Sequence, residues 1–115
     1  MNAPTLGIDL GGTKILAALV DGEGKILDRD ERPTPADEGP EAVIEAMAAA
    51  AGAVHERSTE VAGVGVGAAG QIQRGTGVVR FSPNLDWHDV PLGKRLGERL
   101  GRPVAVSSDC LLYTS

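Results

Sequence analysis

The chain has 115 residues, of which 42% are hydrophobic, 23% charged and 3% aromatic, and its formal net charge is −5. This length allows one domain with an aliphatic core, and the acidic balance disfavours nucleic acid as a partner, because phosphate backbones are bound by clustered Lys and Arg. One cysteine, Cys110, excludes an internal disulfide, and no secretory signal or membrane-spanning run is found, so we expect a cytoplasmic protein without a membrane partner.

The first predicted feature is a strand–turn–strand unit over residues 6–20. Apolar residues occupy every second position from 6 to 10, and residues 15–20 form an apolar run of strand length. Gly11 and Gly12 separate the two strands, and glycine lets a ligand approach the main chain without a Cβ in the way. The pattern predicts a tight hairpin whose turn is open to a ligand.

Polar residues around this turn have the chemistry of phosphate and metal binding. Free N–H groups in a glycine turn, flanked by the Thr13 hydroxyl and the Lys14 ammonium, form a cradle for an anion. Asp9 places a carboxylate at the end of an apolar strand, and Mg²⁺ binds through one or two carboxylates plus phosphate oxygens. The alternative is an ordinary hairpin with an incidental aspartate, and the turn alone leaves both interpretations open.

The run DLGGTK at residues 9–14 resembles the first phosphate-binding motif of the superfamily that contains sugar kinases, heat-shock chaperones and actin. More narrowly, residues 7–15, GIDLGGTKI, resemble the ROK family (repressors, open reading frames, kinases), which includes bacterial glucokinases. The resemblance implies ATP and Mg²⁺ as cofactors. It also implies that the turn and Lys14 bind phosphate and that Asp9 supports the metal through water.

The next residues predict an α/β lobe. Residues 21–24 form a turn and residues 25–32 a third strand, which completes an antiparallel meander, and residues 34–40 are a loop through which no element continues. Apolar residues at steps of four and three predict a helix over residues 40–57, and a Val/Gly run at 61–67 predicts a buried strand. Three antiparallel strands followed by a βαβ unit form the mixed sheet of a ribonuclease-H-like lobe, as in the actin-like ATPase and sugar kinase superfamily.

Residues 65–70, GVGAAG, match the spacing G-x-G-x-x-G of dinucleotide sites. That fingerprint requires its glycines to open a helix, whereas a turn-rich stretch follows here, so we expect a glycine-lined loop at the carboxyl end of a strand instead. In ROK kinases this stretch lines the sugar pocket. The resemblance therefore implies sugar contacts for Gly67, Ala69 and Gly70, with Ala69 standing where many relatives carry proline.

A short strand is predicted at residues 78–81, and the loop SPNLDW at residues 82–87 resembles the A-P-N-L-x-W segment of the family. The amide of Asn84 can donate to and accept from neighbouring sugar hydroxyls. The alternative is that Asn84 caps its own turn, and the family resemblance favours the sugar. We expect Trp87 to anchor this loop by packing.

A second amphipathic helix is predicted over residues 91–100, where leucine recurs every fourth position, and Gly101 ends it. Arg95 and Arg99 are expected on its solvated face. The following residues 104–106 predict a further buried strand.

Ser108 and Asp109 follow this last predicted strand. A kinase needs a carboxylate to accept the proton of the attacked hydroxyl, whereas a purely structural Asp109 would cap a helix. In ROK kinases a P-V-x-V strand precedes N-D-A-N, whose aspartate is the general base and whose first asparagine binds sugar. Asp109 matches that base, Ser108 stands in place of that asparagine, and residues 110–115 depart from the pattern and are expected to be a non-native tail.

Three motifs in the family's order lead us to expect that residues 1–109 form the N-terminal lobe of a ROK sugar kinase, without the C-terminal lobe or the family's zinc site. The implied reaction transfers phosphate from ATP to a hexose, with glucose as the first candidate, and the full-length protein is expected to be a homo-oligomer. Alternatives are an N-acetylhexosamine kinase and the lobe of a sugar-responsive repressor. The repressor is disfavoured because no room for a helix-turn-helix precedes Leu6. Because closure of two lobes aligns the reactants, we expect the chain alone to be inactive or nearly so.

Overall fold

The computed structural model describes residues 3–55, 61–68, 70–73, 76–82, 85 and 87–107. The first half of the chain contains β1 (Thr5–Leu10), β2 (Lys14–Val20), β3 (Ile26–Pro33), the 3₁₀ turn η1 (Ala36–Glu38) and α1 (Pro40–His55). The second half contains β4 (Gly63–Ala68), β5 (Gln71–Gln73), β6 (Val78–Ser82), β7 (Trp87–Val90), α2 (Leu92–Leu100) and β8 (Val104–Ser107).

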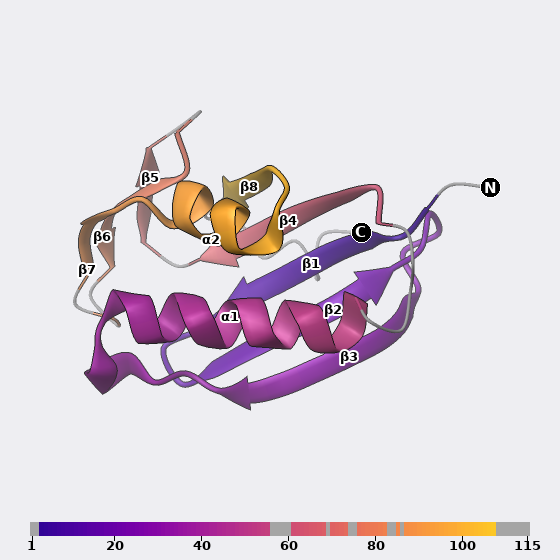
Figure 1. Ribbon diagram of the computed structural model, residues 1–115, viewed down its shortest axis with the longest axis horizontal. Coiled ribbons are helices and arrows are strands. Elements are labelled where there is room, and N and C mark those ends of the chain that lie inside the picture. Colours follow the sequence, from indigo (N-terminus) through magenta and orange to yellow (C-terminus); the bar gives the residue numbers. More distant parts are fainter. Residues whose placement is uncertain are drawn as a thin grey trace.

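A five-stranded mixed sheet, in the order β3-β2-β1-β4-β8, forms the centre of the fold (Figure 1). The first three strands pair antiparallel, whereas β4 runs parallel to β1 and β8 runs parallel to β4. The predicted meander followed by a βαβ unit is therefore confirmed. The glycines of the G-x-G-x-x-G match lie within β4 and before β5 and do not open a helix, which agrees with the rejection of a dinucleotide site.

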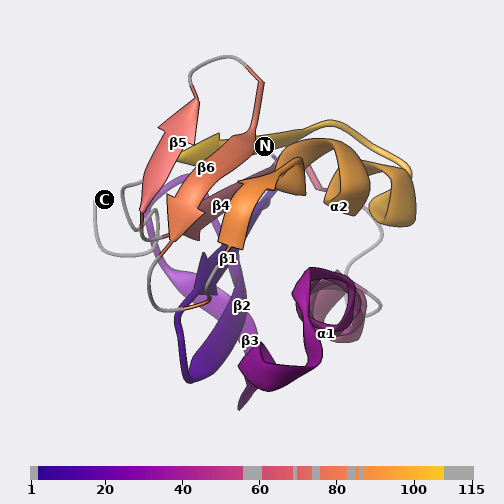
Figure 2. The same ribbon diagram turned by 90° about the vertical axis from the view of Figure 1, so that its left-hand side faces the viewer.

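Both helices pack on the same face of this sheet (Figure 2). The predicted apolar face of α1 is confirmed, because Val43, Met47, Ala50 and Val54 are fully buried. Residues spaced three and four apart share one side of a helix, so these four side chains pack against the apolar face of β1 and β2. Gly101 adopts a left-handed conformation, and its N–H donates a hydrogen bond to the Gly97 carbonyl. The helix α2 therefore ends at the predicted residue.

A second, three-stranded antiparallel sheet of β5, β6 and β7 lies beyond the carboxyl ends of β1 and β4 (Figure 1). The sequence analysis predicted only β6 and treated the flanking segments as turn and loop. Trp87 begins β7 and is 1% exposed, so the prediction that it anchors this region by packing is confirmed. Its partner across the ladder is Ser82.

Three smaller expectations differ from the structure. The loop after β3 contains the turn η1, and β4 begins two residues later than the predicted strand at 61–67. The strand at 104–106 is not fully buried: Val104 and Val106 are half-buried and Ala105 is exposed, because β8 is the edge strand of the sheet. Among the residues that the structure describes, no helix has the length and apolar character needed to cross a bilayer.

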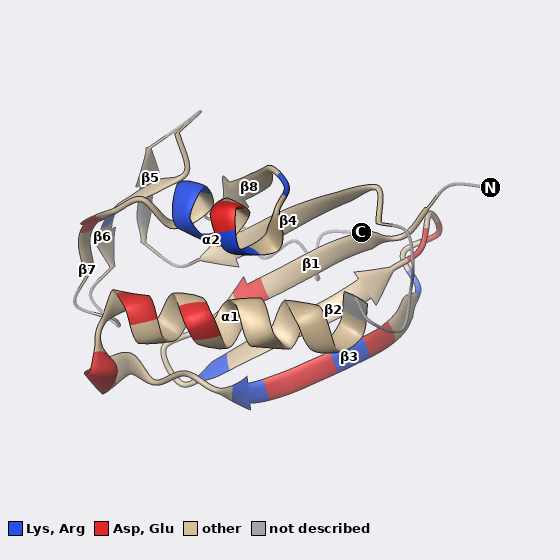
Figure 3. Ribbon diagram, viewed as in Figure 1, with Lys and Arg blue, Asp and Glu red and all other residues tan. Residues whose placement is uncertain are grey.

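Acidic segments of α1 and basic segments of α2 lie side by side (Figure 3). Ion pairs that the sequence analysis did not predict join the two helices there. Arg95 and Arg99 of α2 both bind Glu41 of α1, the latter at 2.7 Å, and Arg99 also binds Glu45 at 2.9 Å. The hydrogen bond from Arg99 to Glu41 raises the pKa of the guanidinium above its usual value. The expectation that both arginines lie on the solvated face of α2 is confirmed, and their ion pairs are an addition to it, because the packing of α1 beside α2 was not visible in the sequence.

Replacing Arg99 by alanine should lower the midpoint of thermal unfolding, because two interhelical ion pairs are lost. The difference should shrink as salt is added, since exposed charges are screened. Lys94→Ala on the same helix is the matched control, because Lys94 pairs with no described residue. A loss of stability that does not depend on salt would show that the ion pairs are not its cause.

Candidate functional site

The carboxyl ends of three parallel strands bring Asp9 and Gly67, two of the predicted site residues, to one edge of the large sheet. In the register of β1 and β4, Asp9 lies beside Gly67, and in the register of β4 and β8, Gly67 lies beside Ser107. Residues from three distant parts of the sequence therefore form one row. In α/β sheets ligands bind outside the carboxyl ends of the strands, so this row is where a site is expected.

Asp9 is the acidic residue of this row. It is half-buried, lies between Leu16 of β2 and Gly67 of β4, and forms no ion pair with a described residue. Gly67 places no side chain beside the carboxylate. No group of three His, Cys, Asp or Glu side chains within the described ranges is arranged to hold a metal. Asp9 offers one carboxylate, and Mg²⁺ can bind through a single carboxylate while it keeps several of its waters.

The turn between β1 and β2 leaves main-chain donors open. The N–H of Gly11 donates to the Lys14 carbonyl at 2.9 Å and closes the turn. The N–H groups of Gly12 and Thr13, and the Thr13 hydroxyl, donate to no residue in the described part of the chain. These adjacent N–H and O–H groups are the donors that an anion at the turn would meet. Gly11 shapes the turn, because a Cβ there would lie 3.1 Å from the Lys14 carbonyl oxygen.

Lys14 begins β2 and lies on the same face as Asp9, because Asp9 pairs with Leu16, two residues further on. Its ammonium is 3.9 Å from a carboxylate oxygen of Glu31 and its side chain is 68% exposed. An exposed pair at this distance is weak, so the ammonium stays available to an anion at the turn. A hollow of about 270 Å³ beside the turn is lined by Thr13, Lys14, Glu31, Arg32 and Pro33.

Gly70 is the second described glycine of the predicted sugar loop. Its φ is +119°, and a Cβ built there would lie 2.3 Å from the Phe81 carbonyl oxygen of β6. Glycine is therefore required at this position by the backbone itself. The other predicted sugar or catalytic residues lie outside the described residues; these are Ala69, Asn84, Ser108 and Asp109.

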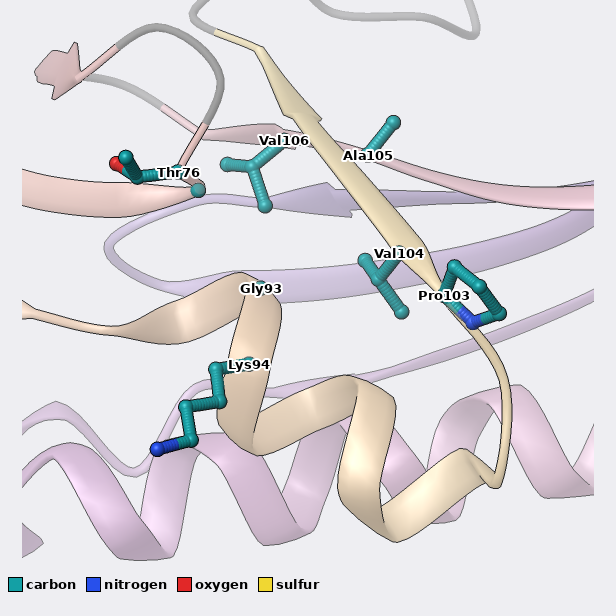
Figure 4. A pocket seen from close by; sticks show the side chains of 8 residues that line it. Thr76, Gly93, Lys94, Pro103, Val104, Ala105 and Val106 are labelled. Atoms are coloured by element: carbon teal, nitrogen blue, oxygen red, sulfur yellow. The ribbon is translucent and has the colours of Figure 1, made fainter.

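A larger hollow of about 470 Å³ lies elsewhere, between the turn before β6, the start of α2 and the edge strand β8 (Figure 4). Val106 points from β8 toward Gly93 at the start of α2, and Val104 points toward the following part of the helix, near Gly97. Among the described residues the lining is mostly apolar and carries one charged side chain, Lys94. None of the predicted site residues that the structure describes lines this hollow, so the candidate site remains the carboxyl edge of the sheet.

The sequence analysis assigned no role to Thr34, which hydrogen-bonds the glycine turn twice. Its signal in the sequence was the run Pro33-Thr34-Pro35, in which two prolines restrict a polar residue directly after a strand.

The chain is similar to known proteins in both sequence and structure. The profile of the ROK family matches residues 5–114. A glucokinase of Streptomyces coelicolor is 44% identical over 105 residues, which cover 91% of this chain and 32% of the relative. An N-acetylmannosamine kinase of Escherichia coli O157:H7 is 37% identical, with coverage of 91% and 35%.

Among solved structures, a ROK family glucokinase from Streptomyces griseus in complex with glucose and AMPPNP is similar, with a TM-score of 0.83 and 40% identity. The match covers 91% of this chain and 33% of that one. The chain thus spans about a third of the length of the relatives that it matches.

Proposed function

The chain belongs to the ROK family, and from this membership we propose that it supplies the phosphate- and sugar-binding edge of a kinase that transfers phosphate from ATP to glucose. The observation that carries the proposal is the juxtaposition of Asp9 with a turn whose Gly12 and Thr13 N–H groups are unpaired among the described residues. The similarity to the Streptomyces glucokinases supports glucose as the acceptor.

At the phosphate end, the N–H groups of Gly12 and Thr13 and the Thr13 hydroxyl would bind phosphate oxygens, and Lys14 would add a positive charge. Asp9 would accept hydrogen bonds from water ligands of Mg²⁺. When bound, Mg²⁺ neutralises the charge that develops on the phosphates.

At the sugar end, Gly67, Ala69, Gly70, Asn84 and Ser108 would contact the hexose, and Asp109 would act as the general base. The sugar hydroxyl oxygen forms the new bond to the γ-phosphorus while the bond from that phosphorus to ADP breaks. The hydroxyl proton passes to the Asp109 carboxylate.

A chimeric enzyme tests this proposal. Residues 5–109 of this chain replace the matching third of the Streptomyces coelicolor glucokinase, and glucose-dependent ADP formation is measured. We expect activity of the same order as the parent enzyme, because the edge residues are all supplied by the insert. A folded chimera without activity would contradict the proposal.

N-acetylmannosamine is the second candidate substrate, because an N-acetylmannosamine kinase is also similar over 91% of the chain. The same chimera, assayed with both sugars, distinguishes the two. A higher kcat/KM for N-acetylmannosamine than for glucose would replace the first assignment by the second.

A further inference from the structure

Thr34 ties the glycine turn to the end of β3. Its hydroxyl donates to the Gly11 carbonyl at 2.8 Å, and its N–H donates to the Thr13 carbonyl at 2.9 Å. Its own carbonyl accepts the N–H of Ala36 at 2.8 Å, which begins η1. Every polar group of this half-buried residue is therefore engaged, two of them with the turn.

These bonds determine the direction of the donors in the turn. A trans peptide unit is planar, so its C=O and N–H point in opposite directions. The Gly11 carbonyl shares its peptide unit with the Gly12 N–H, and a bond to that carbonyl orients the N–H away from Thr34. The bond from the Thr34 N–H to the Thr13 carbonyl fixes the peptide unit between Thr13 and Lys14 in the same way. The Thr13 N–H belongs to the peptide unit that lies between these two fixed units.

The two neighbours of Thr34 restrict the anchor itself. Pro33 has a fixed φ, and Pro35 confines the residue before it to extended conformations. Because its backbone is restricted in this way, Thr34 loses little conformational freedom when its hydroxyl and N–H form these two hydrogen bonds. Gly12, by contrast, would be free to rotate if only its neighbours in the hairpin held it.

We infer that Thr34 is a positioning residue for phosphate binding, holding the Gly12 and Thr13 N–H groups in the direction that receives a phosphate oxygen. The inference rests on the proposed function of the turn. Thr34 bonds the carbonyl side of the turn and the phosphate meets the N–H side, so Thr34 does not itself touch the ligand.

The test measures the affinity of the chain for inorganic tripolyphosphate with Mg²⁺ by titration calorimetry. Thr34→Val removes the hydroxyl and keeps the shape, Thr34→Ser restores the hydroxyl, and Thr34→Ala is a second variant without it. Thr76→Val is the matched control, because its hydroxyl donates to the Gln73 carbonyl at 3.2 Å in a different turn. Thermal unfolding is recorded for each variant.

We expect Thr34→Val and Thr34→Ala to weaken tripolyphosphate binding by about threefold to tenfold, the effect of one net hydrogen bond, while Thr34→Ser and Thr76→Val bind as the unsubstituted chain does. Unchanged affinity in Thr34→Val or Thr34→Ala, or an equal loss in Thr76→Val, overturns the inference and leaves the proposed function intact. If the unsubstituted chain itself does not bind tripolyphosphate, the phosphate role of the turn is wrong, and the inference falls with it.

Discussion

Replacing Asp109 by asparagine in the chimeric enzyme should lower kcat by about 10²–10⁴-fold, the usual contribution of a general base. Asparagine keeps the size and polarity of the side chain but cannot accept the proton of the sugar hydroxyl. The KM for glucose should change little, because binding of the ground state does not require proton transfer. Steady-state kinetics with glucose as the varied substrate gives both quantities.

Asp89→Asn is the matched control for this experiment. Asp89 lies in β7, is exposed and pairs with Arg80 at 2.6 Å, so the same charge is removed at a residue with no predicted role in the site. Its φ of 53° lies in the left-handed region, which asparagine also tolerates. We expect parental kinetics from this variant. A loss of less than about tenfold in Asp109→Asn would remove Asp109 from the role of base.

Gly70→Ala should lower the free energy of unfolding of the chain by at least about 2 kcal/mol, since a strained φ and an overpacked side chain each cost about 1–3 kcal/mol. The cause is the approach of β6, whose Phe81 carbonyl oxygen would lie 2.3 Å from the new Cβ. The backbone must shift to relieve this contact, because a carbonyl cannot rotate away as a flexible side chain does. Urea unfolding followed by Trp87 fluorescence measures the loss.

Gly63→Ala in β4 is the control for this substitution. Gly63 has no atom within 4 Å of a built Cβ and does not have a positive φ, so its alanine variant should be at least as stable as the parent chain. Equal stability of the two alanine variants would show that the close approach of Phe81 to Gly70 does not constrain the chain.

The large sheet could be predicted because its elements carry periodic signals. The apolar positions of β1 and β2, and the α1 residues Val43 and Met47, follow the spacing of a strand or a helix, and these elements lie where expected. The small sheet could not be predicted in full, because β5 and β7 have three and four residues and are too short to show a period.

Within the site, the residue types were visible in the sequence, and so was one relationship between them. The placement of Asp9 beside Gly67 follows from parallel pairing of β1 with β4, which the expected βαβ order implied. The hydrogen bonds of Thr34 to the turn join residues more than 20 positions apart and depend on where β3 ends. The ion pairs of Arg99 with Glu41 and Glu45 likewise depend on the packing of two helices and leave no local pattern.

The most direct test of the proposed phosphate-binding edge is an amide NMR titration of the isotope-labelled chain with AMPPNP and Mg²⁺. We predict that the largest shift changes occur at Gly12 and Thr13, with smaller ones at Asp9 and Gly67, because the Asp9 carboxylate and two N–H groups that are unpaired among the described residues lie at this edge. Changes confined to the hollow between α2 and β8, or no change at the turn at millimolar ligand, would contradict the account.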